Sequence, residues 1–221
     1  AILNHAKIDR TVNMRDIGFA IGPRINAAGR IAHASKAVEL LITADFADAE
    51  EGSEDVSLDN AKRKILDAKT TKEALSFLHS DDAHQNKKST LIFSEHWHKG
   101  ILGIVCNRIQ EHYYRPTIVL SKSGKFYTGS ARSVKGYNLY NAINKCSDIL
   151  ESFGGHAFAA GLTIKPENLE AFAKQFEKIV NDTISDDLLI PTVEVDLNLP
   201  LNEVQERFFK VLNQFEPFGV G

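Results

Sequence analysis

The sequence predicts an α/β fold in which an N-terminal helical connector is followed by a compact α/β domain, a mixed sheet flanked by helices. Three observations lead to this prediction. Up to about residue 85, apolar side chains recur three and four positions apart, the spacing of amphipathic helices. From residue 86 to residue 183, short apolar runs alternate with helical segments, as in α/β domains. Between the two regions, residues 79–89 are polar and turn-forming, so we place a domain boundary there.

The expected elements follow in order along the chain. In the connector, residues 34–42 and 57–78 have helical spacing, and Ser57 followed by Asp59 is expected to start the second helix. In the α/β domain, the predicted strands cover residues 89–95, 115–122, 125–133 and 159–164, and the predicted helices cover residues 100–113, 138–153 and 167–182. The second and third strands are expected to form a hairpin. Beyond the domain, we expect a strand at residues 191–200 and a helix at residues 202–215.

The composition excludes several classes of protein. The chain has 221 residues, of which 43% are hydrophobic and 25% charged, as in globular proteins. Two cysteines are too few for a disulfide framework, so we expect reduced thiols and a cytoplasmic location. No apolar run approaches the roughly 20 residues that span a bilayer, so no membrane partner is expected. The chain starts without Met and stops at FGVG, and we expect it to be a fragment of a longer protein.

Charge is distributed unevenly along the chain. Residues 45–59 and 182–206 contain acidic side chains and no Lys or Arg, whereas residues 87–135 are predominantly basic. A locally basic segment of this kind is typical of a site for a polyanion. The alternative is an ordinary solvated surface of strands and helices.

Two arginines, Arg24 and Arg30, lie in a glycine-flanked segment at residues 22–31. Their guanidinium groups can bind a phosphate through two parallel hydrogen bonds. The alternative is a capped helix start with two exposed arginines.

A second basic segment follows the first predicted strand. His98 and Lys99 precede a predicted helix, whose first backbone amides favour an anion. His96 and His98 could also belong to a metal site, but no Asp or Cys accompanies them at ligand spacing, so we expect no metal there.

Ser130 and Arg132 alternate on a predicted strand, so their side chains share one face of it. A hydroxyl group beside a guanidinium group suits a terminal phosphate. The alternative is an exposed edge strand.

Gly154, Gly155 and His156 are expected in a loop after a helix. The glycines leave room near the backbone, and the imidazole can hydrogen-bond a phosphate or a scissile oxygen. A histidine with a purely structural role is the alternative. No nucleophile signature or metal-binding carboxylate cluster accompanies these segments. The residues alone therefore predict anion binding and no certain catalytic residue.

Seven segments, taken together and in this order, resemble the bacterial RecJ exonucleases of the DHH phosphoesterase superfamily. They are residues 22–30, 58–64, 97–105, 115–120, 129–133, 153–161 and 217–221. The resemblance covers nearly the whole chain. It implies that residues 1–85 are the end of a DHH domain with connecting helices, residues 86–183 a DHH-associated domain, and residues 184–221 the beginning of a truncated OB-type domain.

The resemblance also implies an activity. Enzymes of this family degrade single-stranded DNA from the 5′ end in DNA repair and recombination. They use Mn²⁺ or Mg²⁺ held by a DHH domain that this sequence lacks. We therefore expect no metal bound to this chain, no nuclease activity from it alone, and the missing DHH domain as its partner in cis. Two alternatives are a non-catalytic nucleic-acid-binding module and a DHH phosphodiesterase acting on short oligonucleotides.

The resemblance assigns roles to residues already named. Ser130 and Arg132 match the pocket for the 5′-terminal phosphate, joined by Arg24 or Arg30. The groove opposite the metals is matched by His98, Gly154, Gly155 and His156. Trp97 and Tyr137 could stack on bases, but an ordinary core or surface role is the expectation for both.

Overall fold

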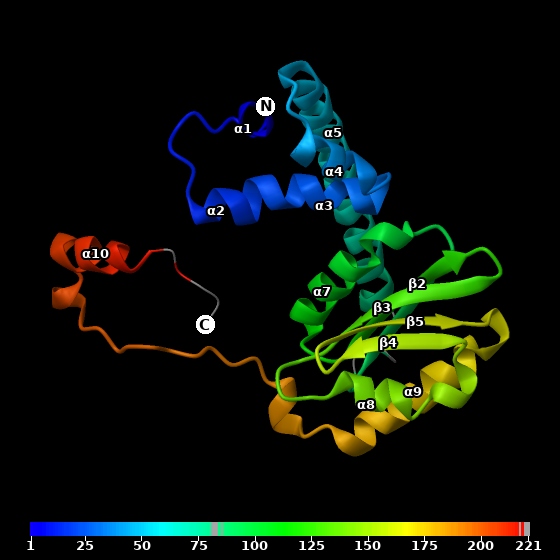
Figure 1. Cartoon of the computed structure of the whole chain (residues 1–221). Coiled ribbons are helices and arrows are strands. Elements are labelled where there is room, and N and C mark those ends of the chain that lie inside the picture. The colour runs from blue at the N-terminus through cyan, green and yellow to red at the C-terminus, as the bar shows by residue number, and fades with distance from the viewer. Residues whose placement is uncertain (81–83, 85, 217, 219–221) are drawn as a thin grey trace.

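The computed structural model describes residues 1–80, 84, 86–216 and 218 of the chain (Figure 1). Helices form its N-terminal region: α1 (Ile2–His5), α2 (Met14–Asp16), a π-helical turn (Ile17–Ile21), α3 (Gly22–Ile31), α4 (Ser35–Ile42) and α5 (Phe46–His79). The sheet consists of β1 (Thr90–Ser94), β2 (Thr117–Ser123), β3 (Phe126–Arg132), β4 (Ser152–His156) and β5 (Ala159–Ile164). The main helices around and beyond it are α7 (Leu102–Tyr113), α8 (Leu139–Asn144), α9 (Leu169–Thr183) and α10 (Glu206–Leu212).

The five strands form one mixed sheet in the order β1-β2-β3-β5-β4. β1 pairs with β2 in parallel, and the other three pairs are antiparallel. The predicted hairpin of β2 and β3 turns through Gly124, whose φ of +61° is available to glycine at little cost. The predicted fold class, N-terminal helices followed by a mixed sheet with flanking helices, is confirmed.

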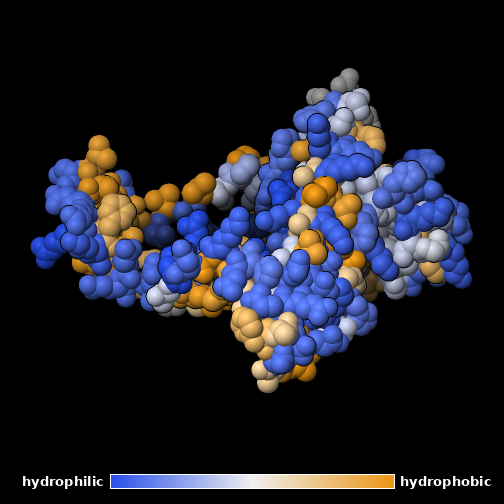
Figure 2. All heavy atoms as spheres, turned by 90° about the horizontal axis from the view of Figure 1, so that it is seen from above, coloured by the Kyte–Doolittle hydropathy of each residue, from blue (hydrophilic) through white to orange (hydrophobic). Residues whose placement is uncertain are grey.

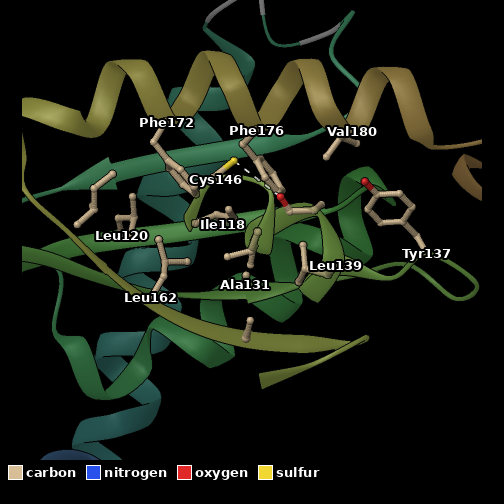
Figure 3. Packing of buried hydrophobic residues seen from close by; sticks show 14 of the residues in the cluster. Ile118, Leu120, Ala131, Tyr137, Leu139, Cys146, Leu162, Phe172, Phe176 and Val180 are labelled. Atoms are coloured by element: carbon tan, nitrogen blue, oxygen red, sulfur yellow. Dashed lines mark hydrogen bonds between the residues drawn. The ribbon is translucent and has the colours of Figure 1, made fainter. Parts of the chain in front are cut away.

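Strand β2 is packed on both of its faces, and its residues 118–120 are apolar. Ile118 and Leu120 point to one face, against Phe172 and Phe176 of α9 (Figure 3). Val119 points to the other face, where it joins a second cluster. That cluster is built from α5, α7 and β1, with Leu78, Val105, Ile109 and Ile92 among its members. A strand buried on both faces explains why this run shows no polar alternation.

Helix α5 begins earlier than the sequence predicted. Asp45, and not Ser57, caps it, because the Asp45 carboxylate accepts the backbone N–H groups of Ala47 and Asp48 at 2.8 and 3.1 Å. The helix then runs for 34 residues to His79. Its first half packs on α3 and α4, and its second half packs on α7. The long helix therefore connects the helical region to the sheet.

The predicted helix over residues 138–153 is wrong in its second half. Helix α8 ends at Asn144, a 3₁₀ turn follows at Ser147–Ile149, and β4 begins at Ser152. Pairing of this last segment with β5 satisfies its backbone groups, starting with the Glu151 N–H and the Thr163 carbonyl at 3.0 Å. Gly154 and Gly155 are also poor helix formers. The segment predicted as a loop is therefore an edge strand.

The C-terminal segment also differs from prediction. Residues 191–200 are extended but form no strand, since they pair with no other segment in the part of the chain that the structure describes. The predicted helix over residues 202–215 is shortened to α10. Apolar side chains of this segment are exposed, among them Val193 at 88% and Leu201 at 87% (Figure 2). The alternating sequence of residues 191–200 is typical of a strand, but no strand among the described residues pairs with it.

Both cysteines, Cys106 and Cys146, are free and buried, and burial raises the pKa of each thiol to about 12. None of the helices that the structure describes is sufficiently long and apolar to cross a membrane. The predicted linker at residues 79–89 lies partly outside the described residues.

Candidate phosphate-binding site

The side chains of Ser130 and Arg132 converge on the first turn of α7. A Cβ built on Gly103 would lie 3.0 Å from Arg132 Nη2 and 3.4 Å from Ser130 Oγ. The two polar groups thus share one face of β3, as their spacing predicted, and both reach the same point on the helix. A residue larger than glycine at position 103 would compete with them for this space.

A cleft of about 390 Å³ opens beside this point. Its lining residues are Arg30, Gly103, Ile104, Asn107, Arg108, Glu111 and Arg132. Arg30 arrives from the end of α3, where its Nη1 donates to the Gly100 carbonyl at 3.2 Å. The cleft therefore combines residues of the helical region with residues of the sheet and α7.

The charges in the cleft favour an anion. Within the described residues, neither Arg30 nor Arg132 forms an ion pair, and Arg132 Nη1 donates to the carbonyl of Ala131 at 2.9 Å. Arg108, in contrast, pairs with Asp67 at 2.9 Å. Glu111 also lines the cleft, where its carboxylate accepts from the Asn107 amide at 2.7 Å. Two guanidinium groups with unused donors outweigh this one carboxylate and suit a doubly charged oxyanion.

Arg24 lies elsewhere and is fully engaged. Its Nε donates to Ser57 Oγ at 3.2 Å, its Nη1 to the Ala20 carbonyl at 2.7 Å and its Nη2 to the His5 carbonyl at 3.2 Å. These bonds tie α3 to α5 and to the end of α1. Of the two arginines that the sequence offered, the structure brings Arg30 to the cleft and uses Arg24 within the helical region.

The face of the sheet that carries Ser130 and Arg132 continues across β5 to the edge strand β4. Arg132 is opposite Ala159, and Ala159 is opposite His156. Directly opposed residues point to the same face, so His156 and Arg132 share it at a separation of about 10 Å, two strand spacings. His156 is exposed.

A second row on this face consists of Ser130, Gly161 and Gly154. Both glycines are exposed. The face therefore presents a floor of small residues between the cleft and His156.

The two neighbouring glycines of β4 have different reasons to be glycine. Gly155 has a φ of +148°, and a Cβ there would lie 2.3 Å from the Ala159 carbonyl oxygen. Its conformation is thus demanded by the hairpin itself. Nothing lies within 4 Å of the position of a Cβ on Gly154, so internal packing does not require glycine there. Of the predicted pair, only Gly154 has open space at the position of a Cβ.

Both histidines named from the sequence accept a backbone hydrogen bond at Nδ1. His98 accepts from the Gly100 N–H at 3.2 Å, which caps a short 3₁₀ helix (Lys99–Ile101) beside the cleft. His156 accepts from the Phe158 N–H at 3.3 Å. A neutral imidazole that accepts at Nδ1 carries its proton on Nε2. Each ring can therefore donate from Nε2 to an oxygen of a ligand.

Trp97 and Tyr137 are core residues, as expected, with exposures of 4% and 7%. Neither ring is available to stack on a base. Gly103 was not predicted as part of the site, although the sequence contains a signal for it. Glycine inside a predicted helix costs about 1 kcal/mol relative to alanine, which indicates a close contact at that position.

The structure combines an α/β domain with a helical region, and the cleft between them has charges that favour an anion. Comparison with known proteins identifies its relatives. Residues 86–182 match the DHHA1 domain family. The chain is 34% identical over 210 residues to the single-stranded-DNA-specific exonuclease RecJ of Bacillus subtilis, which covers 94% of this chain and 26% of that protein. It is 30% identical over 214 residues to RecJ of Escherichia coli, with coverage of 92% and 37%.

A solved structure agrees with the sequence comparison. RecJ of Thermus thermophilus in complex with Mg²⁺ superimposes with a TM-score of 0.83 and 28% identity, over 99% of this chain and 33% of that one. The chain is a homologue of the RecJ exonucleases that contains the DHHA1 domain and spans between 26% and 37% of the length of its RecJ relatives.

The residues described here offer no site for a metal ion such as the Mg²⁺ of that structure. Within residues 1–80, 84, 86–216 and 218, no group of three or more His, Cys, Asp or Glu side chains could hold a metal ion. His96 and His98 have no third ligand among them. We assign no metal-dependent step to this chain.

The two arginines provide a matched pair of substitutions. We expect Arg24→Ala to lower the free energy of unfolding by about 1–3 kcal/mol, because the Ser57 hydroxyl and two backbone carbonyls lose a charged donor. Arg30→Ala is expected to leave that free energy nearly unchanged and to abolish the rise in Tm that inorganic phosphate produces. Urea unfolding and thermal unfolding with and without phosphate measure both effects. If Arg24→Ala abolished the phosphate effect and Arg30→Ala destabilised the fold, the assignment of Arg30 to the site would be contradicted.

The two glycines provide a second pair. Gly155→Ala should lower the free energy of unfolding by about 1–3 kcal/mol, because alanine at a positive φ is strained and its Cβ meets a carbonyl oxygen. Gly154→Ala should change it by no more than about 0.5 kcal/mol, since the space is open. Equal destabilisation by both substitutions, measured by urea unfolding, would show that Gly154 is also structural.

Proposed function

We propose that this chain forms the substrate-binding portion of a 5′-to-3′ single-stranded-DNA exonuclease that acts in DNA repair and recombination. The observation that carries the proposal is that Arg30 and Arg132 line one cleft together with Gly103, where the Ser130 hydroxyl also lies. The relatives named above support the substrate, because each is a single-stranded-DNA-specific exonuclease. In the complete protein, Mn²⁺ or Mg²⁺ bound outside the residues described here would supply the hydrolytic chemistry.

The cleft suits the end of a strand better than its interior. A terminal phosphate monoester carries nearly two negative charges at pH 7, whereas a phosphodiester carries one. Two guanidinium groups without carboxylate partners, together with the Ser130 hydroxyl, match the monoester in charge and in donors. Binding of the 5′-phosphate here sets the position of the strand without reading its sequence.

The floor of the sheet would then carry the following nucleotide. Gly154 and Gly161 leave room for the sugar–phosphate backbone, and Nε2 of His156 can donate to a phosphate oxygen. His98 lies beside the cleft, next to the contact between Arg30 and Gly100. The role of the chain is to hold the scissile bond at a fixed distance from the bound end.

Arg132→Ala tests the proposal. We expect it to weaken binding of a 5′-phosphorylated single-stranded oligonucleotide by about 1–3 kcal/mol, because charge-assisted hydrogen bonds are lost. Binding of the same oligonucleotide with a 5′-hydroxyl end should change little. Fluorescence anisotropy on the 221-residue chain measures both affinities.

Lys125→Ala is the matched control, because Lys125 is an exposed cation in the turn before β3, at the opposite end of the strand from Arg132. Lys125→Ala should lower both affinities slightly and equally, because it removes only a long-range attraction that salt already screens. Equal losses for the phosphorylated and the hydroxyl end with Arg132→Ala would contradict a pocket for the terminal phosphate.

The chain alone should not cleave DNA. We expect no release of nucleotides from 5′-labelled single-stranded DNA when the purified chain is incubated with Mn²⁺ or Mg²⁺. Nuclease activity that copurifies with the chain and is abolished by EDTA would show that the hydrolytic machinery lies within these 221 residues.

A further inference from the structure

Phe158 is an exposed aromatic residue in the turn between β4 and β5. Its side chain is 56% exposed, and it belongs to none of the buried clusters that the described residues form. A single exposed phenylalanine is common on protein surfaces and by itself indicates nothing. Its place in the fold is informative, because the turn adjoins the row that contains Arg132 and His156.

The turn is held rigidly by backbone hydrogen bonds. The Phe158 carbonyl accepts the N–H of Ser133 at 3.0 Å, and the Ala157 carbonyl accepts the N–H of Leu139 at 3.0 Å. The Phe158 N–H itself donates to His156 Nδ1 at 3.3 Å. The turn is therefore already ordered before a ligand binds. Because no further conformational entropy is lost on binding, the affinity for a ligand that contacts the Phe158 ring is higher.

The turn that carries Phe158 lies close to Arg132 in the sheet. Phe158 precedes Ala159, which is the direct strand partner of Arg132. The Cα atoms of Phe158 and Arg132 are thus separated by at most about 9 Å, one residue step plus one strand spacing. The base of a nucleotide whose phosphate is bound at Arg132 can therefore reach the turn that carries Phe158.

One face of the Phe158 ring is open. The ring contacts the His156 imidazole in a T-shaped arrangement, with centroids 6.2 Å apart and planes at 65°. One such contact covers no more than one face of the phenyl ring, and the exposed fraction shows that the other side is open to solvent. Base stacking requires one accessible aromatic face of this kind.

We propose that Phe158 stacks on a base near the 5′ end of the bound strand, so that the terminal segment is held by a phosphate contact and a base contact together. This inference rests on the proposed function. Stacking on a phenyl ring is tolerant of sequence, because every base has a π-face. The contact would favour single strands, in which a base can leave its neighbours more easily than in a duplex.

The test compares a 5′-phosphorylated eight-thymidine oligonucleotide with one that has abasic residues at its first two positions. The wild-type chain should bind the abasic oligonucleotide about tenfold to a hundredfold more weakly, the range of one lost base–aromatic stack. Phe158→Ala and Phe158→Leu should bind both oligonucleotides with the weaker affinity. Phe158→Trp should restore the difference, because it restores a stacking face.

Phe46→Ala is the matched control. Phe46 is 69% exposed at the start of α5, the end that packs on α4, whereas the other end of α5 packs against α7 and the sheet. It should bind both oligonucleotides as the wild-type chain does. Because the wild-type comparison needs no substitution, the inference stays testable even if a variant at position 158 fails to fold.

The outcomes separate this inference from the proposed function. Equal weakening of both oligonucleotides by Phe158→Leu overturns the stacking role alone, provided that Arg132→Ala weakens binding of the 5′-phosphorylated end and not of the 5′-hydroxyl end. If the wild-type chain binds 5′-phosphorylated and 5′-hydroxyl oligonucleotides equally well, the proposed function is overturned, and the stacking inference with it. Equal affinity of the wild-type chain for the two oligonucleotides also overturns the stacking role.

Discussion

The backbone of Gly100 lies directly against the carbonyl oxygen of Arg30, and the site depends on this contact. A Cβ at Gly100 would lie 2.0 Å from that oxygen, so only glycine lets the end of α3 approach the start of the helix after β1. The approach places the Arg30 guanidinium beside Arg132, although the two residues belong to different structural regions. It also puts the His98 cap next to the same contact. The cleft between the two regions, the candidate phosphate-binding site, follows from this one backbone contact.

The sheet supplies the second half of the site because its two faces have different surroundings. Against α9 the face is apolar, and the side chains of Ile118, Leu120, Phe172 and Phe176 exclude water from it. On the opposite face, α7 covers β2 and β3, while β5 and β4 lie bare toward the edge. Because side chains alternate across a strand, Ser130 and Arg132 point to the side of α7, next to the bare half, while Ala131 between them is buried in the core. Stability and binding use alternate residues of the same strands.

Glycines in and around the site have different physical causes, and the distinction bears on function. Gly129 and Gly155 have no space for a Cβ, because carbonyl oxygens of the protein lie 2.2 and 2.3 Å from it. Gly154 has free space, and Gly103 shares its space only with the two polar groups of the cleft. The first two glycines are required by folding. The other two are those at which a larger residue would fold and yet interfere with a ligand.

The sequence by itself determined the fold class and the shared face of Ser130 and Arg132. These follow from helical and strand periodicity, which are local properties of the chain. Only the tertiary structure decided which arginine reaches the cleft, because Arg30 finds its partner Gly100 at a separation of 70 residues. In the same way, residues 152–156 became a strand only because β5 pairs with them, and residues 191–200 did not because no strand among the described residues does. Whether the hydrogen-bonding groups of these residues find partners depends on long-range contacts, which local sequence patterns do not predict.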